Sequence, residues 1–227
     1  MERTTAKLLD HRHVGGVAAL YLAAAYLAAM PYFLLVLDYP SVADPAAKLA
    51  LIVAHQADLY VFNLLAYVVF GLVLTVLALV LHDHLTGATP AMARVIVGWG
   101  VIWSCLLIAN GTIANMGMEY VVNLQVHDAT GAVAAWQLIE AIVNGLGGAG
   151  GELLGGAWML MVSMAGLRAR RLPGALHWLG LATGIVGLAS NIPPLRESAA
   201  VFGLLQIVWF IWLGITFLRT GQRVGSV

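Results

Sequence analysis

The stretch that decides the fold is AGGELLGGAWMLMVSMAGLRARRLP, residues 149–173. Its central part, residues 153–167, holds no charged side chain, and three arginines follow within four positions. An apolar run with arginines at one end is typical of a membrane helix with a cytoplasmic end, because cytoplasmic loops collect Lys and Arg. We therefore predict a membrane span over residues 149–167 whose basic end faces the cytoplasm.

The same polarity repeats along the whole chain. Of the eleven Lys and Arg residues, nine fall on one side of the alternating apolar segments. They are Arg3, Lys7, Arg12, Arg94, Arg168, Arg170, Arg171, Arg219 and Arg223, whereas Lys48 and Arg196 lie on the opposite side. This asymmetry predicts a multi-pass membrane protein with both termini in the cytoplasm.

The composition agrees with this class and excludes others. The chain is 61% hydrophobic and only 10% charged, whereas soluble domains carry about 25% charged residues. Its formal net charge is zero, so we expect no nucleic-acid partner. The single cysteine, Cys105, excludes an intrachain disulfide and a CxxC redox pair.

The hydrophobic segments predict an all-α fold, a bundle of six membrane-spanning helices in one membrane domain, residues 1–227. The spans are expected at about 14–37, 46–81, 91–118, 149–167, 174–192 and 199–218. The first is too long for a signal-peptide core, so we interpret it as an uncleaved anchor. Residues 132–143 have helical spacing but are too few to cross a bilayer, which indicates a short interfacial helix on the outer face. The tryptophans are expected mostly to face lipid or the interface.

Polar residues inside a membrane are costly, so they indicate where a function could reside. Counted along ideal helices, four of them fall roughly 20–28 Å from the inner surface and form one layer. They are Asn63, Asn110, Glu152 and Gln206, with His55, Asn115 and Glu119 just above them. Glu152 has no intramembrane Lys or Arg to pair with, so we expect it to be protonated or hydrated. It can also simply bond neighbouring helices.

These residues favour a non-catalytic function. We expect an outward-facing cavity floored by Asn63, Asn110, Glu152 and Gln206, with Asn115 and His55 as further ligand-binding residues. A polar floor with apolar walls suits a small apolar or lipid-like ligand. Alternatively, the protein could bind a membrane-protein partner or a second copy of the chain.

Two catalytic alternatives stay open. Glu152 or Glu119 could act as the general acid or base of a lipid-modifying enzyme. Alternatively, His55, Glu119 and Glu152 could hold the metal of a membrane hydrolase or oxidase. No HxxH or HExxH pattern occurs and no histidine lies in mid-span, so we predict neither a metal nor a haem nor another cofactor.

The second half of the chain also resembles a known family. The features are Gly151-Glu152 at the start of the fourth span, the basic turn of residues 168–173, and the closing stretch of residues 209–219. They are similar to a group of bacterial six-span membrane proteins defined by the domain of unknown function 4386. The likeness covers residues 145–220, and the first half matches in layout. It implies a six-span fold in a bacterial inner membrane, and no activity or catalytic residue.

Overall fold

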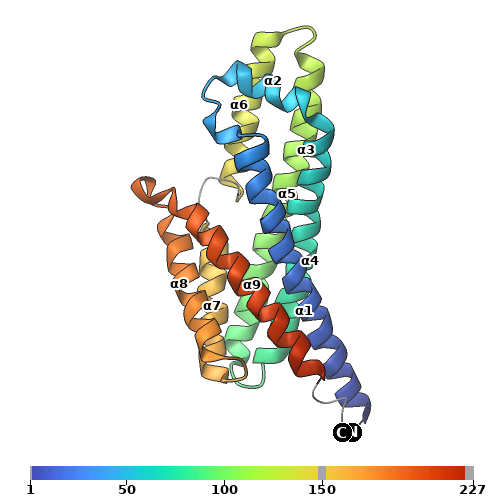
Figure 1. Ribbon diagram of the computed structural model, residues 1–227, viewed down its shortest axis with the longest axis vertical. Helices are drawn as coiled ribbons and strands as arrows, with labels where there is room; N and C mark the ends of the chain where they lie inside the picture. The colour runs from blue at the N-terminus through green and yellow to red at the C-terminus, as the bar shows by residue number, and fades with distance from the viewer. Residues whose placement is uncertain (1, 148–151, 223–227) are drawn as a thin grey trace.

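Helix α5, Pro90–Leu124, is the longest helix among the described residues and runs along most of the height of the molecule (Figure 1). The computed structural model describes residues 2–147 and 152–222. Pro90 stands at the first helical position of α5, where its missing N–H removes no hydrogen bond. Helix α4, Phe70–Leu85, precedes it across a short turn and packs along it. All regular structure in the described residues is helical.

Two further groups of helices complete the bundle. Helix α1, Glu2–Pro31, packs against α4 and against the last helix, α9, Ser198–Gln222. Helices α7, Leu153–Ala169, and α8, Gly174–Ala189, form a hairpin whose second helix packs on α9. Helix α1 begins and α9 ends at the same end of the molecule (Figure 1).

Two shorter helices lie at the opposite end. They are α2, Pro45–Ala54, and α6, Ala129–Gly145, and they contact each other (Figure 1). The side chains of Asp44 and Asp128 cap their first turns by accepting hydrogen bonds from Ala47 N and Gly131 N, each at 2.8 Å. Such caps satisfy backbone donors that a helix leaves free at its start. Helix α6 thus covers the interfacial helix expected at residues 132–143 and extends it at both ends.

The helix expected over residues 46–81 is divided in the structure. Helix α2 ends at Ala54, because His55 leaves the helical region with φ −112° and ψ 22°. Helix α3, Gln56–Asn63, then continues through a π-helical segment, η3, Leu64–Val69, into α4. Helix α1 similarly passes into a π-helical segment, η1, Tyr32–Val36. The two π-helical segments could not be read from the apolar pattern, because it does not report hydrogen-bond register.

Four helical stretches of the described residues are long and apolar enough to cross a membrane, so the chain is a membrane protein. They are His11–Val36, Gln56–Leu85, Pro90–Leu124 and Ser198–Arg219. Helices α7 and α8 are apolar but have only 17 and 16 residues, close to the shortest length that spans a bilayer. Residues 149–151 of the span expected at 149–167 lie outside the described part. The count of six spans stays a prediction.

Aromatic side chains fill the core where the helices meet. Trp103, Trp158 and Trp209 are at most 2% exposed, and their rings follow one another at centroid distances of 5.8 and 6.2 Å. The indole of Trp158 donates a hydrogen bond to Ile96 O at 3.1 Å. The expectation that the tryptophans mostly face lipid therefore fails for these three, whereas Trp178 is 66% exposed.

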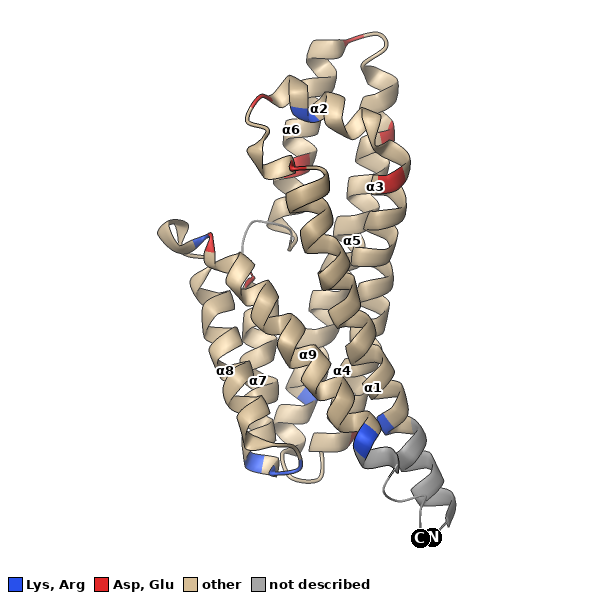
Figure 2. Cartoon of the chain, viewed as in Figure 1, with Lys and Arg blue, Asp and Glu red and all other residues tan. Residues whose placement is uncertain are grey.

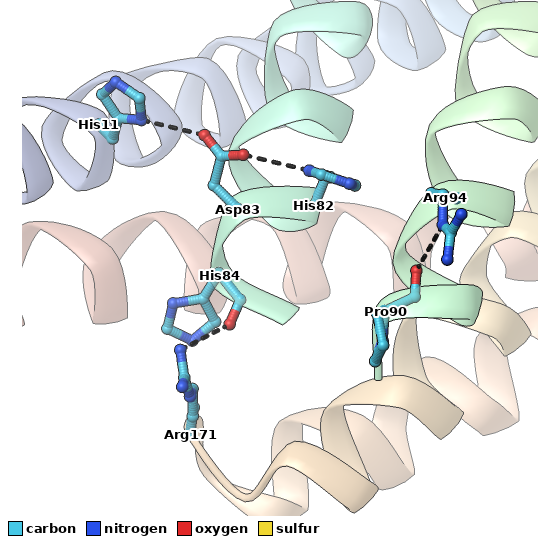
Figure 3. A network of polar contacts seen from close by, with 7 residues as sticks. All are labelled: His11, His82, Asp83, His84, Pro90, Arg94 and Arg171. Atoms are coloured by element: carbon cyan, nitrogen blue, oxygen red, sulfur yellow. Dashed lines mark hydrogen bonds and ion pairs between the residues drawn. The ribbon is translucent and has the colours of Figure 1, made fainter. Parts of the chain in front are cut away.

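Charge separates the two ends of the molecule. Lys and Arg gather mainly where α1 begins and α9 ends, and Asp and Glu mainly toward α2 and α6 (Figure 2). At the basic end, Asp83 contacts His11 at 3.2 Å and His82 at 3.1 Å (Figure 3). Arg171 donates to His84 O at 3.1 Å. These contacts tie α1 and the turn after α7 to the end of α4.

Candidate functional site

A cavity of about 550 Å³ lies toward the acidic end of the bundle. Its walls come from α1 and η1, from α3 and η3, from α2, α5 and α6, and from Glu152 and the start of α9. Most lining side chains are apolar, and a few polar groups stand among them. This volume falls within the range of about 300–1,000 Å³ that is usual for small-molecule sites.

Both π-helical segments border the cavity. Phe33 and Leu34 of η1 and Ala66 and Tyr67 of η3 line its walls. A π-helical turn adds one residue to the ring closed by each hydrogen bond, and such turns occur frequently at functional sites. The two irregular turns thus shape the wall of the cavity rather than the far end of the bundle.

Four side chains join α2, α6 and the loop before α2 at one end of the cavity. Lys48 Nζ lies 2.9 Å from Glu140 Oε1 and 4.7 Å from the centre of the Tyr39 ring. Trp136 Nε1 donates to the Tyr39 hydroxyl at 3.1 Å. Burial, with a smaller contribution from Glu140, raises the pKa of the Tyr39 phenol above its usual value, so this hydroxyl stays protonated.

Glu152 lies where the chain enters α7. Its backbone N–H donates to Ser190 Oγ at 2.9 Å, and that hydroxyl donates to Gly187 O at 2.7 Å. A Cβ atom on Gly155 would lie 3.2 Å from Glu152 Oε2 and within 3.0 Å of the Trp103 and Phe202 rings. The absence of a side chain at Gly155 thus leaves space that the Glu152 carboxyl group and the two aromatic rings share. In the described part of the chain, no side chain donates a hydrogen bond to it.

Asn110 supplies a second polar group to the cavity from the middle of α5. It is fully buried, and its Nδ2 donates to Val143 O of α6 at 2.7 Å. That bond fixes the orientation of the amide, because only the nitrogen can donate. Its Oδ1 is buried and accepts no hydrogen bond from the described residues.

Asn63 lines the cavity, whereas its hydrogen-bond partner Asn115 does not line it. Asn63 Nδ2 donates to Asn115 Oδ1 at 3.0 Å, and Asn115 Nδ2 donates to Tyr60 O at 3.1 Å. These buried bonds connect α3 with α5. The pair positions the wall, because buried amides with partners stabilise helix contacts.

The other predicted site residues lie elsewhere. Gln206 is fully buried in α9 but does not line the cavity. His55 Nδ1 lies 3.8 Å from Asp58 Oδ2, and Glu119 is exposed. Neither His55 nor Glu119 lines the cavity. Within residues 2–147 and 152–222, no three His, Cys, Asp or Glu residues form a group that could hold a metal ion. His55, Glu119 and Glu152 are therefore not brought together.

Comparison with protein families places the chain among its relatives. The family described as domain of unknown function DUF4386 matches residues 17–216. The chain belongs to this family. The match includes the first half of the chain, where only the order of the apolar segments had indicated a resemblance. Neither the curated proteins nor the solved structures gave a match. Membership of the DUF4386 family assigns no activity to the chain. The cavity is therefore the feature that indicates a function.

In this DUF4386 protein, aromatic side chains line the same cavity as the polar groups, and the sequence did not predict them there. Tyr26, Tyr67, Phe70 and Trp103 all line the cavity. The Phe70 ring centre lies 5.4 Å from that of Tyr26 and 6.5 Å from that of Trp103. The sequence holds a partial signal, since all four residues lie inside predicted spans. It does not show which face of each helix these residues occupy.

Proposed function

We propose that the chain binds an amphipathic, lipid-like molecule in this cavity. The observation that carries the proposal is the juxtaposition of Glu152, Asn110 and Asn63 in one largely apolar cavity of about 550 Å³. Ligand sites typically combine apolar walls with a few polar groups that orient the ligand. A molecule with an apolar chain and one polar end satisfies both parts of this lining.

The proposal extends to where the protein works. The basic end, which carries Arg12, Arg94 and Arg168, would face the cytoplasm of a bacterial inner membrane. The cavity is lined by residues of α2, α3 and α6, and these helices lie at the end that carries most of the Asp and Glu residues (Figure 2). It would therefore lie in the outer half of the bilayer and receive its ligand from the outer leaflet or the periplasm.

A cavity-filling substitution tests the proposal. Ala29 lines the cavity, whereas its neighbour Ala28 is exposed and does not. We expect Ala29→Phe to reduce binding of radiolabelled dodecanol to the protein in nanodiscs at least tenfold, because the ring occupies the site. Ala28→Phe, with the same added volume on the same helix, should bind dodecanol like the wild type.

Empty nanodiscs give the background from partition into lipid, and thermal unfolding confirms that both variants fold. Wild-type binding no greater than this background would refute the proposal. Equal loss in Ala28→Phe and Ala29→Phe would show that the cavity is not the binding site, which also refutes it.

A further inference from the structure

Among the described residues that line the cavity, one carboxyl group has no cationic partner. Among the described residues that line it, Lys48 is the one cation, and Glu140 already pairs with it at 2.9 Å. Glu152 is left as a carboxyl group with no described cation beside it. An ionised carboxylate removed from water is strongly destabilised unless a positive charge accompanies it.

The polar groups of the cavity also leave hydrogen-bond acceptors unfilled. Asn110 Oδ1 is a buried acceptor without a donor, and its Nδ2 is committed to Val143 O. The Glu152 carboxyl offers further acceptor positions that no described side chain fills. Acceptor positions thus stay open in the cavity, where the hydroxyls of Tyr26 and Tyr67 are among the donors that the aromatic lining offers.

The walls beside these acceptors are aromatic. Tyr26, Tyr67, Phe70 and Trp103 line the cavity together with Glu152, and the Trp103 ring lies against Gly155, next to the carboxyl group. The faces of aromatic rings attract cations, most strongly for tryptophan, and more so where water is excluded. An anion would find no free positive charge here, because Lys48 is paired.

We propose that the ligand of this cavity is a lipophilic cation with hydrogen-bond donors, such as a long-chain primary amine, held by Glu152 and Asn110 among aromatic rings. This rests on the proposed function and adds the chemical class of the ligand. The ammonium group supplies the missing charge to Glu152 and a donor to Asn110 Oδ1. The alkyl chain occupies the apolar part of the cavity.

Three probes with the same chain test the inference: dodecylamine, dodecanol and dodecanoate, each radiolabelled and bound to the protein in nanodiscs at pH 7. The amine is then charged, as a lysine side chain is. We expect the wild type to bind dodecylamine at least tenfold more tightly than dodecanol, and dodecanoate most weakly. Glu152→Gln should bind dodecanol normally and lose the preference for the amine. Glu119→Gln, which alters an exposed carboxylate outside the cavity, should keep it.

The outcomes separate the two proposals. Equal binding of dodecylamine and dodecanol, or a preference retained in Glu152→Gln, would overturn the inference and leave cavity binding intact. Binding of none of the three probes above empty nanodiscs would overturn both. If Glu152→Gln does not fold, the order of the three affinities in the wild type still decides, because a preference for dodecanoate or dodecanol contradicts a cation site.

Discussion

Lys48 and Glu140 stand 92 positions apart in the sequence, and their side chains meet with Nζ 2.9 Å from Oε1. The contact joins α2 to α6 at one end of the cavity. Both side chains are largely withdrawn from water, with 23% and 21% of their surface exposed. The pair therefore connects two short helices that pack beside the long helices of the bundle.

We expect this pair to hold α2 against α6. Exposed ion pairs contribute up to about 1 kcal/mol, and removing one partner of a fully buried pair costs about 3–5 kcal/mol. For this largely but not fully buried pair we expect a coupling free energy of about 1–2 kcal/mol between Lys48→Met and Glu140→Gln. A double-mutant cycle on unfolding in detergent measures it. Additive single effects would show that the contact contributes nothing.

The close approach of α7 and α8 makes a second prediction. A Cβ atom on Gly156 would lie 2.8 Å from Leu188 N and 2.9 Å from Gly184 O. These are backbone atoms that cannot rotate away, so Gly156→Ala must separate the helices. We expect a loss of about 1–3 kcal/mol in unfolding free energy, measured by thermal unfolding in detergent.

Gly98 provides the matched control on α5. A Cβ atom there would have no neighbour within 4 Å, so Gly98→Ala should stabilise the helix by about 0.5–1 kcal/mol. A Gly156→Ala protein as stable as the wild type would contradict the packing of α7 on α8.

The proposed orientation is tested by labelling cysteines from one side of the membrane. In a Cys105→Ser background, Thr86→Cys lies in the exposed turn between α4 and α5, and His127→Cys in the exposed turn between α5 and α6. An impermeant maleimide added to intact spheroplasts should label His127→Cys and leave Thr86→Cys unlabelled. Both should react after permeabilisation. The reverse pattern would place the basic end outside.

Three of the four polar residues predicted to form one layer line the cavity. Asn63, Asn110 and Glu152 line it, and Gln206 does not. Depth along a helix follows from counting residues at a constant rise. Rotation about the helix axis does not, because in lipid both the buried and the exposed face of a helix are apolar. Trp103, at 2% exposure, and Trp178, at 66%, illustrate the same limit.

The sequence by itself determined the helical membrane class, the polarity of the ends and the family, because each depends on composition along the chain. Hydrocarbon selects apolar runs, and Arg and Lys set their orientation whatever the helices later contact. Only the tertiary structure decided that His55 divides the second helix, that two π-helical turns border a cavity, and that aromatic rings line this cavity together with Glu152. These features depend on which helix faces meet, and that is settled by packing between residues far apart in the chain.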